Sequence, residues 1–240
     1  MENKSCSKIP ILLYHRISDD ECPSELAPYK LSLKKFDQQL KWLNQNGYYS
    51  LSMEEWLYCV ANNKTIDGKP VILTFDDGYL DFYENASPIL FEYGFSAHVF
   101  VVTDKVGHAA DWDTKYGPPA PLMTWDQIKY LDARGIGFGS HLATHIPADQ
   151  LTLEILLNEA VCSKNALEEN LMKTIRTLAL PYGITGIEIE KTLLKAGFTQ
   201  LFLTRHAIAE IHGNPAQIPR LEINGLDNID QFYTIFNESI

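Results

Sequence analysis

Residues 71–79 read VILTFDDGY, an apolar run that ends in two adjacent carboxylates and a glycine. A run of this kind predicts a strand that is buried on both faces of a sheet. Asp76 and Asp77 cannot share that environment cheaply, because an unpaired buried charge is costly. We therefore expect the strand to end in a cleft, where a positive group compensates the acids. The alternative is an ordinary Asp-Asp-Gly turn, in which Gly78 supplies a backbone conformation that other residues avoid.

The composition is that of an ordinary globular protein, with 240 residues of which 45% are hydrophobic and 21% charged. This length predicts a single domain over residues 1–240. The formal net charge of −11 argues against a nucleic-acid partner, which would call for a basic surface. No apolar run reaches the roughly 20 residues that span a bilayer, and the polar N-terminus lacks a signal-peptide pattern. From these features we expect a cytoplasmic protein, and they predict nothing about its oligomeric state.

Four cysteines are scattered along the chain without a Cys-x-x-Cys pair: Cys6, Cys22, Cys59 and Cys162. Their spacing indicates neither a thiolate zinc site nor a disulfide framework. We therefore expect reduced cysteines that serve mainly in packing.

Strand and helix patterns alternate along the chain. Apolar runs predict strands over residues 9–14, 71–75, 97–102, 136–140, 177–180 and 200–204. Helical spacing and capping signals predict helices over residues 32–47, 52–60, 86–93, 124–131, 153–171, 187–196 and 228–237. This alternation predicts an α/β fold, a distorted (β/α) barrel with about seven parallel strands. In such barrels the chemistry lies at the carboxyl ends of the strands, where Asp76 and Asp77 are expected.

A second strand end carries two histidines. Residues 137–145 read GFGSHLATH, so His141 and His145 are four positions apart. If a helical turn begins at the strand end, both imidazoles project from one face. Two imidazoles and a carboxylate form a divalent-metal site of the Zn²⁺ type with open positions, and Co²⁺, Ni²⁺ or Mn²⁺ are alternatives. A histidine pair at this spacing also occurs on surfaces and in cores without any metal.

The two adjacent aspartates suggest a division of labour. Neighbouring side chains at a strand end point in opposite directions, so one carboxylate can bind a metal while the other faces water. A metal lowers the pKa of water from about 15.7 towards 7, and a nearby carboxylate then completes the deprotonation as a general base.

Three motifs in this order resemble those of the polysaccharide deacetylases of carbohydrate esterase family 4, the NodB-homology domain. They are TFDDG at 74–78, SHxxxH at 140–145 and LPYG at 180–183, and the resemblance spans about residues 9–225. It implies a metal-dependent hydrolase that removes acetyl groups from carbohydrates. It also implies Asp77, His141 and His145 as metal ligands, Asp76 as the catalytic base, and the backbone N–H of Tyr182 as an oxyanion donor.

The chain departs from the usual family pattern near its C-terminus, where the Leu-x-His motif of the general acid is absent. The motif instead occurs as Leu13-Tyr14-His15 at the end of the first predicted strand. This order resembles the circularly permuted branch, which is similar to the poly-N-acetylglucosamine deacetylases. The resemblance implies His15 as the acid that protonates the leaving amine and Leu13 as a wall of the acetyl pocket. His206, which follows another strand end, competes with His15, and the alternative role for His15 is a satisfied core histidine.

A second departure concerns an arginine. Ala179 stands where the family's third motif usually has Arg, whereas IPRL at 218–221 resembles a Pro-Arg pair that comes late in the permuted branch. The resemblance implies that Arg220 orients Asp76 through a charge-assisted hydrogen bond. The alternative is that Arg220 forms an ordinary surface ion pair.

The irregular segment 103–124 is long for a loop in a compact domain, which favours a functional or mobile role. Within it we expect Trp112 to contact substrate, because it lies among polar residues, whereas His98 is expected in the core.

The expected function is removal of an acetyl group from an N-acetylated amino sugar or saccharide, in surface polysaccharide biosynthesis. The expected partners are a divalent metal, most of all Zn²⁺, and the acetylated carbohydrate. The alternatives are a deformylase or allantoinase-like amidohydrolase on the same fold and an inactive carbohydrate-binding protein.

Overall fold

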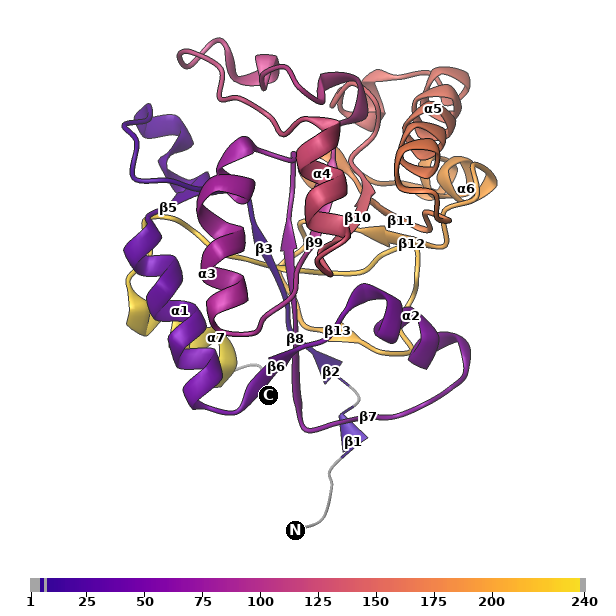
Figure 1. The fold of residues 1–240 in the computed structure, drawn as a ribbon. Coiled ribbons are helices and arrows are strands. Elements are labelled where there is room, and N and C mark those ends of the chain that lie inside the picture. Colours follow the sequence, from indigo (N-terminus) through magenta and orange to yellow (C-terminus); the bar gives the residue numbers. More distant parts are fainter. Residues whose placement is uncertain (1–4, 7, 238–240) are drawn as a thin grey trace.

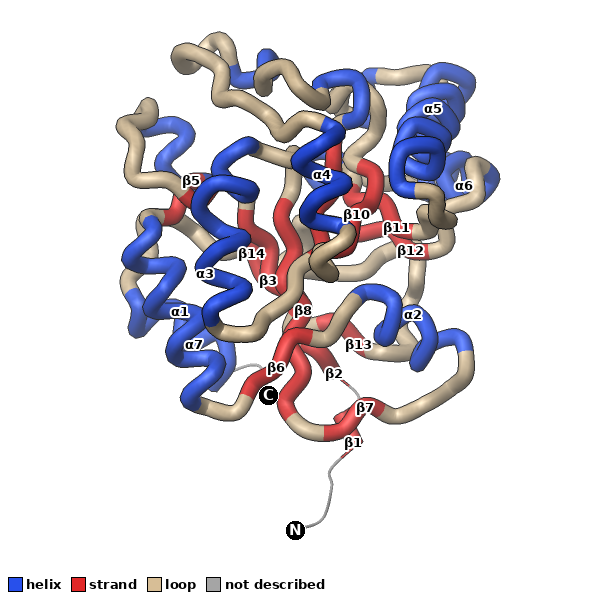
Figure 2. The backbone as a smooth tube through the Cα atoms, in the orientation of Figure 1, coloured by secondary structure: helices blue, strands red, loops and turns tan. Residues whose placement is uncertain are grey.

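The computed structural model describes residues 5–6 and 8–237, and its centre is a curled, half-barrel sheet (Figures 1 and 2). In the described part of the chain this sheet has eight parallel strands, of which β6 Tyr48–Ser50 pairs with β8 to one side of the main order. The other seven follow one another across the sheet: β3 Ile11–Tyr14, β8 Lys69–Phe75, β9 His98–Val101, β10 Gly137–Ser140, β11 Thr177–Ala179, β12 Gln200–Phe202 and β14 Leu221–Glu222. Their order across the sheet is β12-β11-β10-β9-β8-β3-β14. The predicted α/β fold with about seven parallel strands is confirmed.

The first and last strands of this sheet in sequence, β3 and β14, are neighbours, with Leu221 paired to Leu12 and Glu222 to Leu13. On its other side the segment before β14 forms a parallel bridge between Ile218 and Phe202. The segment 218–222 therefore lies between the two margins of the curled sheet.

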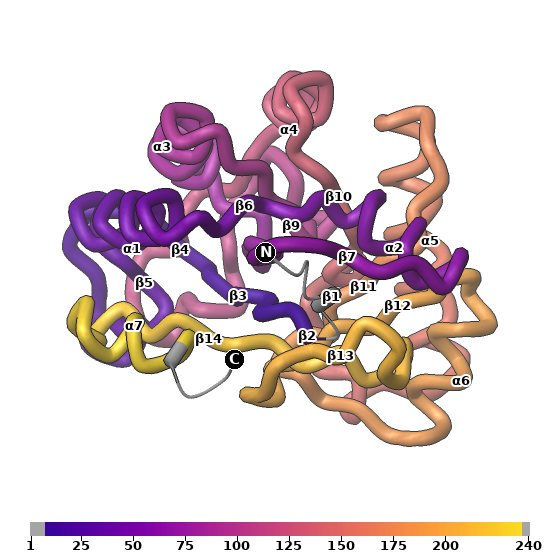
Figure 3. Tube along the Cα trace, turned by 90° about the horizontal axis from the view of Figure 1, so that it is seen from below, coloured from indigo at the N-terminus to yellow at the C-terminus, as the bar shows by residue number. Residues whose placement is uncertain are grey.

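The helices lie mainly outside the curl, as the view from below shows (Figure 3). They are α1 Leu33–Gln45, α2 Met53–Ala61, α3 Ser87–Glu92, α4 Trp125–Asp132, α5 Leu153–Leu171, α6 Ile187–Lys195 and α7 Ile229–Asn237. The predicted helices are confirmed with small shifts at their ends. Capping residues in the sequence mark where helices begin: Ser52 and Glu55 form the predicted capping box at the start of α2.

Several short elements were not predicted from the sequence, because two to six residues are too few to show a clear periodicity. The strands are β1 Ser5–Cys6, β2 Lys8–Ile9, β4 Arg16–Ile17, β5 Lys30–Leu31, β6 Tyr48–Ser50, β7 Ile66–Asp67 and β13 Ala209–Glu210. The short helices are η1 Ser24–Tyr29, η2 Phe82–Ala86, η3 Thr103–Lys105, η4 Asp111–Asp113, η5 Ala148–Gln150 and η6 Pro181–Gly183, of which η2 is a π-helix.

The strand β8 is buried on both faces, as its apolar run predicts. Leu73 and Phe75 belong to the larger core between sheet and helices, whereas Ile72 packs inside the curl with Phe100 and Phe202. Burying side chains of this size contributes about 1.5–3 kcal/mol each. This packing fixes the carboxyl end of β8 against its neighbours and thereby positions the residues that follow it.

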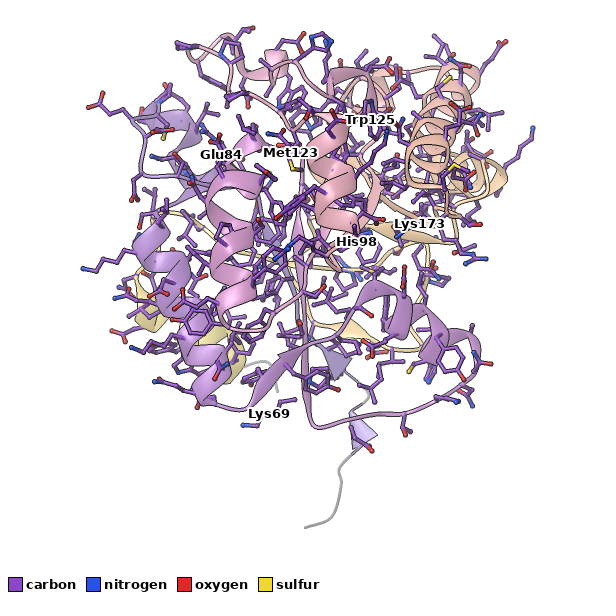
Figure 4. All side chains as sticks on the ribbon, in the orientation of Figure 1. Lys69, Glu84, His98, Met123, Trp125 and Lys173 are labelled. Atoms are coloured by element: carbon purple, nitrogen blue, oxygen red, sulfur yellow. The ribbon has the colours of Figure 1, made fainter. Side chains whose placement is uncertain are left out.

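Because the strands are parallel, their carboxyl ends meet at one edge of the sheet. Figure 4 places Met123 and Trp125 towards this end of the molecule and Lys69, the first residue of β8, at the opposite end. Cys22, Cys59 and Cys162 are free thiols in the structure. Among the helices of the described residues, none combines the length and apolarity that crossing a membrane requires.

Candidate active site

The chain reverses direction directly after β8. Asp76 still continues the ladder, because its N–H donates to the Tyr14 carbonyl at 3.0 Å. Asp77 then adopts a left-handed conformation with φ 74°, and Gly78 follows with φ 79°. A left-handed conformation costs a non-glycine residue about 1–2 kcal/mol, so the surrounding contacts must hold Asp77 in place. The result is that the two neighbouring carboxylates meet different partners.

Asp76 is paired with Arg220. The Arg220 Nη1 and Nη2 groups donate to Asp76 Oδ1 and Oδ2, each at 2.7 Å. The guanidinium is itself held, because Nε donates to the Leu203 carbonyl at 3.0 Å and Nη1 donates to Thr74 Oγ1 at 3.2 Å. Arg220 is fully buried, which excludes the alternative of a surface ion pair. The bidentate geometry fixes the orientation of the Asp76 carboxylate.

The Arg220 charge also controls the protonation of Asp76. Burial raises the pKa of Asp76, but the positive charge of Arg220 and the neighbouring histidines lower it by more, so the net shift is downward. Asp76 is therefore ionised at neutral pH. Each of its oxygens retains a lone pair beyond the one that accepts from Arg220.

Asp77 faces two imidazoles. Its Oδ1 lies 3.3 Å from His141 Nε2 and 3.1 Å from His145 Nε2, and three ligand atoms of these residues lie within 4.8 Å of one another. All three side chains are buried. Despite these distances, Asp77 Oδ1 has no hydrogen-bond partner among the described residues. A buried carboxylate oxygen and two ring nitrogens that converge in this way fit a divalent metal with open positions.

The hydrogen bonding of His141 suits a metal ligand. Its Nδ1–H donates to the Ala179 carbonyl at 2.8 Å, which assigns the proton to Nδ1 and leaves the Nε2 lone pair free. Burial lowers the pKa of His141, but the charges of Asp76 and Asp77 raise it by more. A divalent cation would take over the compensation of these two carboxylates.

His145 is held by ring packing. Trp112 stacks on it with ring centroids 4.2 Å apart, and the Tyr182 ring lies tilted at 5.0 Å. Its Nδ1 is buried and lacks a hydrogen-bond partner within the described part of the chain. The structure thus brings Trp112 into the cleft through contact with a candidate ligand.

The prediction that a helical turn aligns the two histidines is wrong. Residues 141–145 form an irregular loop in which Leu142 and His145 have positive φ values of 62° and 68°. The imidazoles converge because of these two left-handed residues, and their four-residue spacing reflects no helical face. Hydrogen bonds from distant elements, which no local pattern reveals, hold this loop.

The general-acid candidates separate clearly in the structure. His15 lines the same cleft as Asp76 and Asp77, with its ring 5.2 Å from that of Tyr29. Its Nδ1 is buried and, among the residues described, has no hydrogen-bond partner, so His15 is not a satisfied core histidine. His206 is exposed and does not belong to the cleft lining among the described residues. His15 as the acid stays a prediction, but geometry favours it over His206.

Other predicted residues lie at different depths. Leu13 is fully buried beneath the cleft and, in the described structure, is absent from its lining, so its role in an acetyl pocket stays a prediction. Tyr182 has φ 59° and lines the cleft with a half-exposed ring. Burial raises the pKa of Tyr182 to about 12, so the phenol is neutral. The amide of Tyr182 as an oxyanion donor likewise stays a prediction.

The cleft has a volume of about 340 Å³ and includes residues that the sequence did not single out. These residues come from short strands, short helices and the loops between them: Arg16, Cys22, Glu25, Leu26, Tyr29, Lys30, Tyr79, Asp113, Lys115, Tyr116, Thr204 and Glu222. The expected functional segment 103–124 reaches the cleft because it is tied to the β8 turn: Met123 N–H donates to the Gly78 carbonyl at 3.0 Å. Burial, followed by the charge of Asp77, raises the pKa of Asp113. Tyr79, which directly follows the TFDDG motif and donates to Asp113 Oδ2 at 3.4 Å, is the sequence signal that could have pointed to this part of the cleft.

Comparison with known proteins agrees with these features. YxkH of Bacillus subtilis (strain 168) is 30% identical over 192 residues, which cover 80% of this chain and 63% of YxkH, so the chain spans less than two thirds of that relative. The poly-β-1,6-N-acetyl-D-glucosamine N-deacetylase of Staphylococcus aureus (strain MRSA252) is 28% identical over 206 residues, which cover 83% of this chain and 70% of that protein.

Among solved structures, the Streptococcus pyogenes deacetylase PplD in complex with acetate matches with a TM-score of 0.81 and 30% identity. The match covers 95% of this chain and 97% of PplD. The family model described as polysaccharide deacetylase matches residues 63–201, which include the β8 carboxylates and both histidines. Together with the motif order and the curled parallel sheet, these matches show that the chain belongs to the polysaccharide deacetylase family.

Proposed function

We propose that this chain hydrolyses the acetyl group of an N-acetylated amino sugar within a polysaccharide, with a divalent metal held by Asp77, His141 and His145. The observation that carries the proposal is the convergence of three buried ligand atoms beside an ionised carboxylate, Asp76, in an open cleft. A site of this composition, with the candidate acid His15 in the lining of the same cleft, suits hydrolysis of an amide.

The metal would be Zn²⁺ or a related ion, because two imidazoles and one carboxylate leave coordination positions for water and substrate. When bound, it would lower the pKa of water and polarise the acetyl carbonyl. The Nδ1–H of His141 donates to Ala179, which keeps Nε2 aimed at Asp77 and the metal position.

The protein side chains carry the proton transfers. Asp76, kept ionised and oriented by Arg220, accepts the proton of the attacking water. The Tyr182 backbone N–H donates to the oxyanion that develops on the acetyl carbonyl. His15 then donates a proton to the departing nitrogen as the C–N bond breaks, so acetate and a free amine leave. Arg220 acts through Asp76 and is a positioning residue.

The cleft walls support a saccharide substrate. Tyr29, Tyr116 and Tyr182 are exposed around the cleft, and Trp112 also lines it. Aromatic rings offer flat apolar faces with a polar edge, which suits the two-sided chemistry of a sugar ring. The staphylococcal relative is named for poly-β-1,6-N-acetyl-D-glucosamine, and the PplD structure contains acetate. These names support an N-acetylated polymer, and we propose a role in surface polysaccharide biosynthesis.

The test is acetate release from a panel of substrates by protein purified without chelator. The panel includes N-acetylated and O-acetylated oligosaccharides, a formylated amino sugar and allantoin. We expect acetate from the N-acetylated oligosaccharides, loss of activity with chelator, and recovery with Zn²⁺ or Co²⁺. Release of formate, or opening of allantoin in place of deacetylation, would favour the alternative amidohydrolases.

Metal content provides the second arm. His141→Ala and His145→Ala are expected to abolish bound metal in elemental analysis, whereas His212→Ala, at an exposed histidine, should retain it. A protein that binds saccharide, binds no metal and turns over no member of the panel would contradict the proposal. This result would favour a carbohydrate-binding role.

A further inference from the structure

Two polar side chains lie on the buried face of α5. Glu159 and Ser163 are four residues apart, so they lie one above the other on the same side of the helix. Both are buried, among apolar neighbours of the same face such as Leu156 and Ala160. A buried carboxylate is costly unless hydrogen bonds compensate it, so its partners identify what it does.

Among the described residues, the hydrogen-bond partners of Glu159 all lie in the loop between the two candidate histidine ligands. Its Oε2 accepts from the Ala143 N–H at 3.1 Å, from the Thr144 N–H at 2.9 Å and from Thr144 Oγ1 at 3.0 Å. Among the described residues, no lysine, arginine or histidine forms an ion pair with Glu159. The loop itself therefore solvates this carboxylate.

Ser163 reaches the same loop through a relay. The Ser163 hydroxyl donates to the Ala160 carbonyl at 3.1 Å and accepts from the Ser140 hydroxyl at 2.7 Å. Ser140 Oγ in turn accepts from the Leu142 N–H at 3.0 Å. Leu142 is one of the two left-handed residues of the loop, so this relay acts where the backbone is strained.

The opposite side of the loop is held as well. The carbonyls of Leu142 and Ala143 accept from the N–H groups of Thr103 and Asp104, at 3.2 and 3.0 Å. Side chains of α5 thus bind the amides between the two histidines, while η3 binds the carbonyls. These contacts from two sides stabilise the loop conformation, which would otherwise be unfavourable because Leu142 and His145 are left-handed.

We infer that Glu159 and Ser163 are positioning residues of the metal centre, which hold the loop 140–145 so that the Nε2 atoms of His141 and His145 converge on Asp77. The inference rests on the proposed metal site. Without these hydrogen bonds, part of the free energy of metal binding is used to hold the loop in its left-handed conformation. The affinity for the metal therefore falls. Partners beyond the ligands commonly change metal affinity by about 10–100-fold.

The experiment measures Zn²⁺ affinity by competition with a chelator, and the absorption spectrum of the Co²⁺ form. We expect the Zn²⁺ dissociation constant to rise about 10–100-fold in Glu159→Ala, and less in Glu159→Gln, whose amide oxygen can still accept hydrogen bonds. Ser163→Ala should raise it by up to about 10-fold, since its contact is indirect. Glu169→Ala, at an exposed position of the same helix, is the matched control and should match wild type.

Thermal unfolding of the metal-free variants separates positioning from general stability. A lower unfolding temperature together with an unchanged Zn²⁺ dissociation constant and Co²⁺ spectrum in Glu159→Ala would overturn the inference. If Glu159→Ala does not fold, Glu159→Gln and Ser163→Ala decide by the same criteria. Failure of the wild-type protein to bind Zn²⁺ would instead defeat the proposed function, so the two failures are distinguishable.

Discussion

Two buried histidines, one at the start of β9 and one just after β10, have opposite electrostatic environments. His98 begins β9 and is 5% exposed, and its Nε2 contacts Thr177 Oγ1 at 2.9 Å. Burial, followed by the positive charge of Arg220, lowers the pKa of His98 to about 3. His141 follows β10 and is 2% exposed, yet the nearby carboxylates raise its pKa.

The difference shows that burial alone does not define a functional histidine. Around His98 the sheet is closely packed: a Cβ on Gly139 would lie 2.5 Å from Thr177 Oγ1 and 2.8 Å from His98 Nε2. Around His141 the strands deliver carboxylates, an open cleft and an unpartnered oxygen on Asp77. The surroundings of His98 therefore serve packing, whereas the carboxyl ends of the strands around His141 concentrate charge for chemistry.

The largest effect on kcat is expected when the candidate general base, Asp76, is replaced. Asp76→Asn should lower kcat about 10³-fold, because a general base contributes 10²–10⁴-fold and the amide cannot accept the proton. Bound metal should remain, since Asp76 is not among the three converging ligands. Acetate release and elemental analysis check this prediction, and near-normal turnover would show that Asp76 is not the base.

Replacement of the candidate general acid, His15, should lower kcat by less. His15→Ala is expected to lower kcat about 10²-fold without loss of metal, because the leaving nitrogen then takes its proton from water. His206→Ala is the matched control and should leave kcat unchanged, since His206 is exposed outside the cleft lining of the described residues. The opposite ranking of the two variants would transfer the role to His206.

In the packed surroundings of His98, an added methyl group should affect stability rather than chemistry. Gly139→Ala places a Cβ within 2.8 Å of Phe100 Cδ1 and closer still to Thr177 Oγ1. Overpacking of this kind costs about 1–3 kcal/mol, measurable by denaturant unfolding. Gly186→Ala, whose Cβ would meet Ile189 Cδ1 at 4.0 Å, is the control with little expected change. A drop in Zn²⁺ affinity without a drop in the free energy of unfolding would contradict the contrast between the two histidine environments.

The smallest expected effect is a pH dependence from His98. Its folded pKa of about 3 lies below the ordinary value of 6.5, so the unfolded state takes up the proton first on acidification. The contribution of neutral His98 to the free energy of unfolding is fully present above pH 6.5 and is lost as the pH falls towards 3. Between pH 7 and pH 5.5 the free energy of unfolding should fall by about 1 kcal/mol more in wild type than in His98→Gln. Equal pH slopes in chemical denaturation would show that His98 does not titrate in this way.

Short-range patterns in the sequence were sufficient for much of this molecule. The apolar run of β8, the capping box of Ser52 and Glu55, and the spacing of α5 depend on neighbouring residues, so they are legible without any tertiary contact. Residue chemistry indicated a site made of His141, His145 and a carboxylate, and the family resemblance implied that Asp77 is this carboxylate. The structure brings the three together.

Other features depend on contacts between distant segments, which no local pattern encodes. Arg220 and Asp76 are 144 positions apart and meet because β14 lies beside β3. The left-handed loop between His141 and His145 is held by α5 and η3, so the helical turn suggested by its spacing does not form. Residue type and periodicity thus determined the strands, the helices and the reactive groups. Only the tertiary structure decided their mutual orientation, because hydrogen bonds and packing across the sheet outweigh the weak preferences of short irregular segments.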